Sequence, residues 1–187
     1  MRPGEVHVWR IPTGDKPAAH TALRAILAAF TGEPLEFART ASGKPYLPAT
    51  PELRFNLSHG RGMALVGVAL DVEVGVDVER VRPVPQHMAI AERFFPPAEA
   101  ADFSAFPETG REREFFRRWT RLESVLKASG IGLYGAGQQL GGEWTIQEID
   151  AGQEFAAAVA AAATGMHIVM HDYLAGSPVS PEFLGAR

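Results

Sequence analysis

Two acidic residues, Asp77 and Glu79, stand in and just after an alternating apolar segment at residues 72–78. Side chains of a β-strand alternate between its two faces, so both carboxylates and Glu73 would lie on one face, opposite the valines. Two carboxylates spaced in this way could hold one hard cation such as Mg²⁺. The simpler interpretation is a strand whose polar face is exposed to water.

A serine and a histidine, Ser58 and His59, follow the candidate strand at residues 53–57, and Gly60 comes next. A hydroxyl, an imidazolium and backbone N–H groups at such a junction can bind a phosphate. The same side chains could instead satisfy only local backbone groups. Lys44 lies in a Ser-Gly-Lys-Pro loop that could also reach a phosphate, although lysine is an ordinary residue in a surface loop.

A third pair, Glu123 and Lys127, lies four residues apart in the helix expected at residues 112–129, so both side chains share one helix face. A carboxylate and an ammonium group in this arrangement could act as base and acid around a reacting phosphate. A surface ion pair is the alternative. Five arginines near the start of the helix form either a solvated face or a docking surface for an acidic partner. They are Arg111, Arg113, Arg117, Arg118 and Arg121.

The elements that position these residues follow from hydrophobic periodicity and from turn residues. The alanine-rich run at residues 156–163 favours a helix by propensity but a strand by its position between alternating segments. Two prolines at residues 82–85 indicate a boundary, and the tail after Gly176 is expected to be irregular. We expect strands at 6–11, 35–37, 53–57, 63–70, 72–78, 143–150, 155–163 and 166–172, and helices at 17–30, 87–95, 96–106 and 112–129.

The composition narrows the classes of function. The 187 residues include no cysteine, which excludes disulfides, thiolate nucleophiles and cysteine-ligated metals and favours a hard cation bound by oxygen. A net charge of −4 gives no reason to expect nucleic acid as a partner. Neither a signal peptide nor a membrane-spanning segment is recognisable, so we expect a cytoplasmic protein that does not contact a membrane.

Five motifs follow one another between Ser42 and Leu133: GKPYL, FNLSHG, GVDVE, RFF and WTRLESVLKASGIGL. In this order they resemble the 4′-phosphopantetheinyl transferases of the surfactin-synthetase-activating (Sfp-like) type. The resemblance implies an α/β (α+β) fold of two pseudo-symmetric halves, each a small, mainly antiparallel sheet packed with helices. The halves would be residues 1–84 and 85–187, forming one compact unit that is expected to be monomeric.

The resemblance also implies an activity: Mg²⁺-dependent transfer of 4′-phosphopantetheine from coenzyme A to a serine of an acyl or peptidyl carrier protein, with release of adenosine 3′,5′-bisphosphate. The carrier could belong to fatty-acid, polyketide or non-ribosomal peptide synthesis. On this pattern Glu123 would be the base and His59 would hold a phosphate. The metal ligands would be Asp77, Glu79 and Glu123, the catalytic residues Glu123, Lys127 and His59, and the coenzyme A ligands Lys44, Ser58, His59 and Lys127.

The chain departs from the family pattern at Leu122, where the family usually has lysine, and in the short region before Lys44. These departures motivate an alternative, a homologue that binds coenzyme A or a carrier protein without transfer. A Mg²⁺-dependent phosphohydrolase with a water nucleophile and a purely structural α/β domain are further alternatives.

Overall fold

A computed structural model gives the structure of the chain and describes residues 1–2, 4–32, 34–133, 143–176 and 179. One strand and one helix open the chain, five strands follow, and three consecutive helices precede the last three strands. In chain order the elements are β1 (Glu5–Ile11), α1 (Lys16–Thr31), β2 (Ala38–Arg39), β3 (Pro45–Tyr46), β4 (Leu53–His59), β5 (Ala64–Leu70), β6 (Val74–Arg80), α2 (His87–Phe94), α3 (Pro97–Ser104), α4 (Arg111–Ser129), β7 (Thr145–Glu148), β8 (Phe155–Ala161) and β9 (His167–Asp172).

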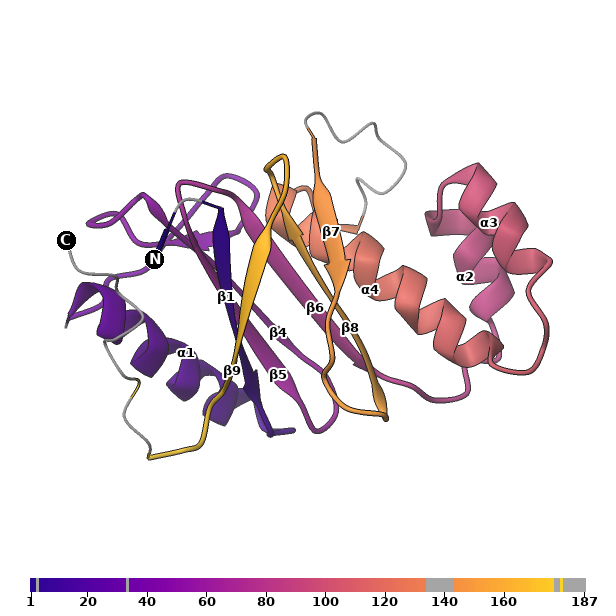
Figure 1. The fold of residues 1–187 in the computed structure, drawn as a ribbon, viewed down its shortest axis with the longest axis horizontal. Helices are drawn as coiled ribbons and strands as arrows, with labels where there is room; N and C mark the ends of the chain where they lie inside the picture. The colour runs from indigo at the N-terminus through magenta and orange to yellow at the C-terminus, as the bar shows by residue number, and fades with distance from the viewer. Residues whose placement is uncertain (3, 33, 134–142, 177–178, 180–187) are drawn as a thin grey trace.

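Two sheets lie face to face, with α1 on the outer side of one and α4 on the outer side of the other (Figure 1). The first sheet has the strand order β4-β5-β1-β9 and the second has β6-β8-β7, while β2 and β3 form a separate small hairpin. Neighbouring strands are antiparallel except β1 and β9, which are parallel. The predicted α/β class, with small and mainly antiparallel sheets packed with helices, is confirmed.

The two sheets repeat one arrangement. Each is built from a strand, a helix and two further strands. The first unit is β1-α1-β4-β5, with the β2–β3 hairpin inserted after α1, and the second is β6-α4-β7-β8, with α2 and α3 inserted before α4. In each unit the last strand lies between the other two. β6 pairs with β8, and β9 pairs with β1. The predicted halves, 1–84 and 85–187, therefore each contribute one strand to the other's sheet, and the division between them stays a prediction.

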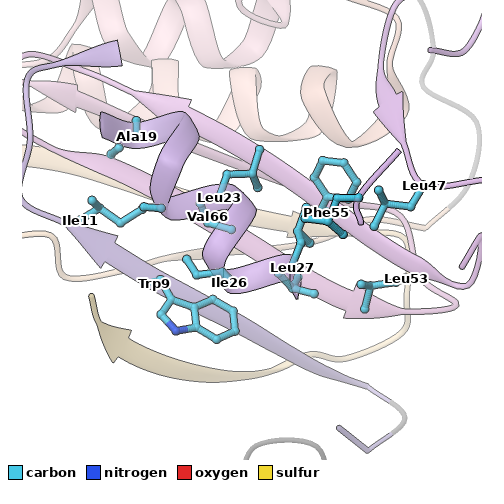
Figure 2. Packing of buried hydrophobic residues seen from close by; sticks show 14 residues of the cluster. Trp9, Ile11, Ala19, Leu23, Ile26, Leu27, Leu47, Leu53, Phe55 and Val66 are labelled. Carbon is cyan, nitrogen blue, oxygen red and sulfur yellow. The ribbon is translucent and has the colours of Figure 1, made fainter. Parts of the chain in front are cut away.

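Figure 2 shows the core between α1 and the first sheet. Ile26 and Leu27 of α1 are fully buried against Trp9 of β1 and Phe55 of β4. The buried residues of α1 recur three and four positions apart, which is the spacing of one helix face, so the predicted amphipathic helix is confirmed. They are Ala19, Ala22, Leu23, Ile26 and Leu27. The helix ends at Gly32, whose φ of 80° and backbone N–H bond to the Ala28 carbonyl close the last turn.

The alanine-rich segment is the strand β8, because both of its faces are buried. Ala157 and Val159 face the core between the two sheets, whereas Ala160 packs against α4. A central strand with small side chains lets a sheet and a helix approach it from opposite sides. Burial on both faces therefore outweighs the helical propensity of alanine in this segment.

Three expectations about local structure are wrong in detail. The strand expected at residues 35–37 lies instead at residues 38–39, and Leu35 is a buried residue of an irregular segment. Ser58 and His59 belong to β4 and not to the turn after it. The strand expected at residues 72–78 runs instead from Val74 to Arg80, and this strand, β6, lies in a different sheet from β5 and packs face to face with it.

The helices predicted at residues 87–95, 96–106 and 112–129 are confirmed as α2, α3 and α4. The tail after Gly176 lies outside the described residues except for residue 179. In the part of the chain that the structure describes, no helix combines the length and the apolar character needed to cross a bilayer.

Gly75 sets the distance between β6 and α4. A Cβ at this position would lie 2.0 Å from the Ser124 carbonyl oxygen and 2.4 Å from the Ala128 nitrogen. We expect Gly75→Ala to lower the free energy of unfolding by about 3 kcal/mol or more, because the helix would have to move away from the sheet. Unfolding in urea measures this change.

The matched control is Gly165→Ala. A Cβ there would meet no atom of the described residues within 4 Å, and the φ of 92° is the unfavourable feature. Its expected cost is about 1–2 kcal/mol. Equal midpoints for the two variants would mean that α4 does not pack this closely on β6.

Candidate active site

Strand β6 presents its acidic residues to helix α4. Val76 and Val78 face the first sheet, and Gly75 and Asp77 face α4, as the alternation predicted. The face is not exposed to water, however, because α4 covers it and leaves Asp77 only 3% exposed. A carboxylate in such a place needs a partner, since burying an unpaired charge is unfavourable.

That partner is Lys127 of α4. Its Nζ donates to Asp77 Oδ1 at 2.5 Å and to Ser58 Oγ at 2.9 Å, and the Ser58 hydroxyl donates to Asp77 Oδ1 at 2.8 Å. The other oxygen, Asp77 Oδ2, is buried and finds no hydrogen-bond partner in the described part of the chain. One carboxylate oxygen therefore stays available to a further cationic or hydrogen-bonding group.

Two more carboxylates, Glu79 of β6 and Glu123 of α4, share this neighbourhood. Burial raises the pKa of both side chains, and the charge of Asp77 raises each pKa further. The three acids therefore repel one another in a poorly solvated place. A bound cation would relieve this repulsion.

The residues fit a hard divalent cation by their chemistry. Asp77, Glu79 and Glu123 offer only carboxylate oxygens, and Asp77 Oδ2 lacks a partner among the described residues. Mg²⁺ prefers such ligands. Within the described ranges, however, no three acidic or histidine side chains are already gathered closely enough to hold a metal ion. In this arrangement Lys127 supplies the positive charge next to Asp77.

The FNLSHG segment has a structural role that the sequence analysis did not predict. β6 is an edge strand of the second sheet, and side chains of β4 bind its backbone: Asn56 Oδ1 accepts the Val76 N–H at 3.0 Å, and Ser58 Oγ accepts the Val78 N–H at 3.4 Å. A polar residue such as Asn56 inside a buried strand was the available signal. These bonds fix the first sheet against the acidic strand.

His59 lies exposed at the end of β4 among cationic groups. Partial burial lowers its pKa, and the charges of Lys16, His20 and Lys127 lower it further. Lys16 and His20 come from the start of α1, and sequence reasoning did not assign them to the site. Several positive groups that repel one another form a favourable place for an anion.

Lys44 does not point to an open phosphate position. Its ammonium group is held by the Glu73 carboxylate at 2.5 Å and by the Ala128 carbonyl at 2.6 Å. Beside it lies an open groove of about 500 Å³, a volume that includes bulk solvent. Both Glu123 and Lys127 line this groove, so a ligand could reach them. The other lining residues are Ser42, Gly43, Lys44, Pro45, Asn56, Leu126, Gly130 and Gly132.

The arginine cluster of α4 is used inside the protein. Arg117 and Arg118 bind Glu114, which is 7% exposed, and Arg117 also reaches Glu148. Arg113 donates to the backbone carbonyl of Gln153. These contacts tie α4 to the strands of the second sheet, which favours a structural role over a docking surface for an acidic partner.

Leu122, the residue that departs from the family pattern, packs against the apolar cluster formed by α2, α3 and α4. It is partly buried there. Its position therefore extends an apolar surface next to Glu123.

A family model described as the 4′-phosphopantetheinyl transferase superfamily matches residues 73–168. The match runs from the residue before β6 into β9, and so it includes the acidic strand and all of α4.

Three relatives are similar to the chain. The 4′-phosphopantetheinyl transferase HetI of Nostoc sp. is 33% identical over 167 residues, which cover 69% of this chain and 70% of HetI. The transferase psf-1 of Bacillus pumilus is 38% identical over 54% of this chain and 42% of its own length. For Sfp of Bacillus subtilis the identity is 31%, over 53% of this chain and 43% of Sfp. The similarity thus spans less than half of each Bacillus protein.

The buried acids are expected to reduce stability when no metal is present. Because the pKa of Glu123 is raised in the folded chain, its charged form is unfavourable there. The resulting loss of stability is fully present above the pKa of Glu123 in the folded chain, and it disappears as the pH falls below the pKa of Glu123 in the unfolded chain. In EDTA at pH 8, Glu123→Gln should therefore raise the free energy of unfolding by about 0.5–2 kcal/mol. The gain should shrink toward pH 4.

Urea unfolding at both pH values measures this effect. Glu92→Gln, on the exposed side of α2, is the matched control and should stay within about 0.5 kcal/mol of the unmodified chain. A Glu123→Gln variant that is less stable at pH 8 would contradict the electrostatic repulsion.

The cationic surroundings of His59 also make a testable prediction. An anion bound there should raise the pKa of His59, by up to about 1, because it offsets the charges of Lys16, His20 and Lys127. Sulfate is a suitable probe because its charge does not change between pH 5 and 8. NMR titration of the histidines with and without sulfate measures the change, and the exposed His167 on β9 serves as the control. An unchanged pKa of His59 would show that no anion binds there.

Proposed function

We propose that this chain, which belongs to the 4′-phosphopantetheinyl transferase superfamily, moves 4′-phosphopantetheine from coenzyme A to a serine of an acyl or peptidyl carrier protein and releases adenosine 3′,5′-bisphosphate. One observation carries the proposal: β6 and α4 meet so that Lys127 contacts Asp77 across 50 residues of sequence, with Glu123 beside them. HetI, psf-1 and Sfp are named as 4′-phosphopantetheinyl transferases, which agrees with this activity.

Asp77, Glu79 and Glu123 would hold Mg²⁺. When bound, the ion would supply positive charge to the pyrophosphate oxygens of coenzyme A while the P–O bond breaks. Two observations support this ligand set: Asp77 Oδ2 has no hydrogen-bond partner among the described residues, and the pKa of both glutamates is raised.

Glu123 would accept the proton of the carrier serine, directly or through a water molecule. Burial and the charge of Asp77 raise its pKa while no metal is bound, which places the carboxylate inside the acidic cluster and next to the proposed reaction centre. The residue also lines the open groove, where a serine of a partner protein could approach.

Lys127 and His59 would bind the phosphates. The Lys127 side chain is 30% exposed and borders the groove, so its ammonium group could stabilise the departing bisphosphate. His59, with cationic neighbours, would hold a phosphate in line. Ser58 is 4% exposed and bonded to Asp77 and Lys127, which supports a role in orienting these two groups next to coenzyme A.

One observation favours a second candidate, a homologue that binds coenzyme A or a carrier protein without transfer. Leu122 packs into an apolar cluster, so the position supplies no cation to the site. The cytoplasmic location, the monomeric state and the absence of nucleic-acid and membrane partners stay predictions, as does the identity of the carrier.

The deciding experiment incubates an apo-carrier protein with this chain, coenzyme A and Mg²⁺ and follows the carrier by intact mass spectrometry. We expect a gain of one phosphopantetheine mass that EDTA abolishes. Glu123→Gln should lower the rate by about 10²- to 10⁴-fold, because the serine loses its proton acceptor. Glu92→Gln, which lies on α2 and away from the site, should leave the rate unchanged.

Two other outcomes would contradict the proposal. Coenzyme A binding without any mass gain on several classes of carrier would favour the non-transferring homologue. Metal-dependent hydrolysis of coenzyme A in the absence of a carrier would favour a phosphohydrolase.

A further inference from the structure

We propose that Lys44 is a positioning residue that fastens the last turn of α4 to the start of β6. This replaces the expectation that Lys44 binds coenzyme A, and it rests on the proposed transfer function. The residue lies in the loop between β2 and β3, and it joins three segments that are distant in sequence.

The ammonium group of Lys44 already has three acceptors. It donates to Glu73 Oε2 at 2.5 Å, to the Ala128 carbonyl at 2.6 Å and, more weakly, to the Val74 carbonyl at 3.4 Å. An ammonium group has three N–H donors, so none is left for a phosphate oxygen. The Lys44 side chain borders the groove but is only 12% exposed, because Glu73 and the end of α4 hold its ammonium group.

The two strong contacts lie next to the proposed catalytic residues. Ala128 directly follows Lys127, and its carbonyl belongs to the last turn of α4, where backbone carbonyls lack helical partners and attract cations. Glu73 immediately precedes β6, the strand that carries Asp77. A single lysine therefore holds the two elements whose side chains meet in the Lys127–Asp77 ion pair.

The loop that carries Lys44 is itself fixed and pressed against the helix end. The Thr40 N–H donates to the Lys44 carbonyl at 2.9 Å, and Thr40 Oγ1 accepts the Lys44 N–H at 3.1 Å. Gly130 ends α4 with a φ of 73°, and a Cβ there would lie 2.9 Å from Ser42 Oγ. The loop thus acts as a rigid support for the last turn of α4.

Loss of this support should affect chemistry more than binding. Without Lys44 the last turn of α4 would lose a charged contact at its end and open more often. Lys127 would then be aligned less well with Asp77, while the surface around His59 would stay intact. A phosphate ligand would behave in the opposite way, because its removal would weaken coenzyme A binding.

The test compares Lys44→Met with Arg54→Met. Arg54 pairs with the same Glu73 carboxylate, at 3.4 Å, but reaches it from β4. We expect Lys44→Met to lower kcat by about 10- to 100-fold, as small misplacements of catalytic groups do, with the KM for coenzyme A changed by less than about twofold. Arg54→Met should leave both constants within about twofold of their original values.

A second experiment combines Glu73→Gln with Lys44→Met in one double variant. If Lys44 acts through Glu73 and α4, the double variant should be no worse than Lys44→Met alone, because both changes break one network. A higher KM with an unchanged kcat in Lys44→Met, together with a lost preference for coenzyme A over 3′-dephospho-coenzyme A, would overturn the proposal and make Lys44 a phosphate ligand.

Hydrogen–deuterium exchange of the peptide covering residues 124–130 tests the same link without any activity. The amides should exchange faster in Lys44→Met than in the unmodified chain or in Arg54→Met. Faster exchange in a chain that transfers nothing would support the positioning role and overturn only the proposed function. Unchanged exchange would overturn the positioning role.

Discussion

The pairing of the buried Asp77 carboxylate with the Lys127 ammonium group is the contact on which the rest of the site depends. A carboxylate that is 3% exposed requires a cation or hydrogen-bond donors nearby, and here these come from α4 and β4. Helix α4 must therefore lie directly on β6. Gly75 makes this close approach possible, since a Cβ there would meet the backbone of Ser124 and Ala128.

The two sheets contribute to the site in different ways. The second sheet carries the acids, because β6 is its edge strand. The first sheet provides Asn56 and Ser58, whose side chains bind the backbone of that edge in place of a neighbouring strand. An edge strand bound by side chains leaves room for ligands near the acids, which a full backbone ladder would fill. The face-to-face packing of the sheets is thus part of the site's construction.

Charge is divided across the site in a way that supports a polyanionic substrate. Acidic groups gather between β6 and α4, and cationic groups gather around His59 at the start of α1. Burial and the charge of Asp77 raise the pKa values of Glu79 and Glu123, and burial and the neighbouring cations lower the pKa of His59, so like charges repel one another in both places. A metal ion on one side and phosphates on the other would relieve both. The separation of acidic and cationic groups therefore supports the proposed transfer chemistry, but it does not identify the carrier protein.

The sequence by itself determined most of the helices and strands and many of the candidate site residues. Alternation placed Asp77 and Glu79 on one face of β6, and four-residue spacing placed Glu123 and Lys127 on one face of α4, because these patterns are local. The tertiary structure decided which sheet or helix covers each face of a strand or helix. The hydrophobic periodicity of the sequence carries no information about this choice. The tertiary structure assigned β6 to the second sheet, made the alanine run a buried strand, turned Lys44 toward Ala128, and paired Arg117 of α4 with Glu148 of β7. Each of these outcomes depends on contacts between residues far apart in the chain, where the covering layer sets both burial and charge.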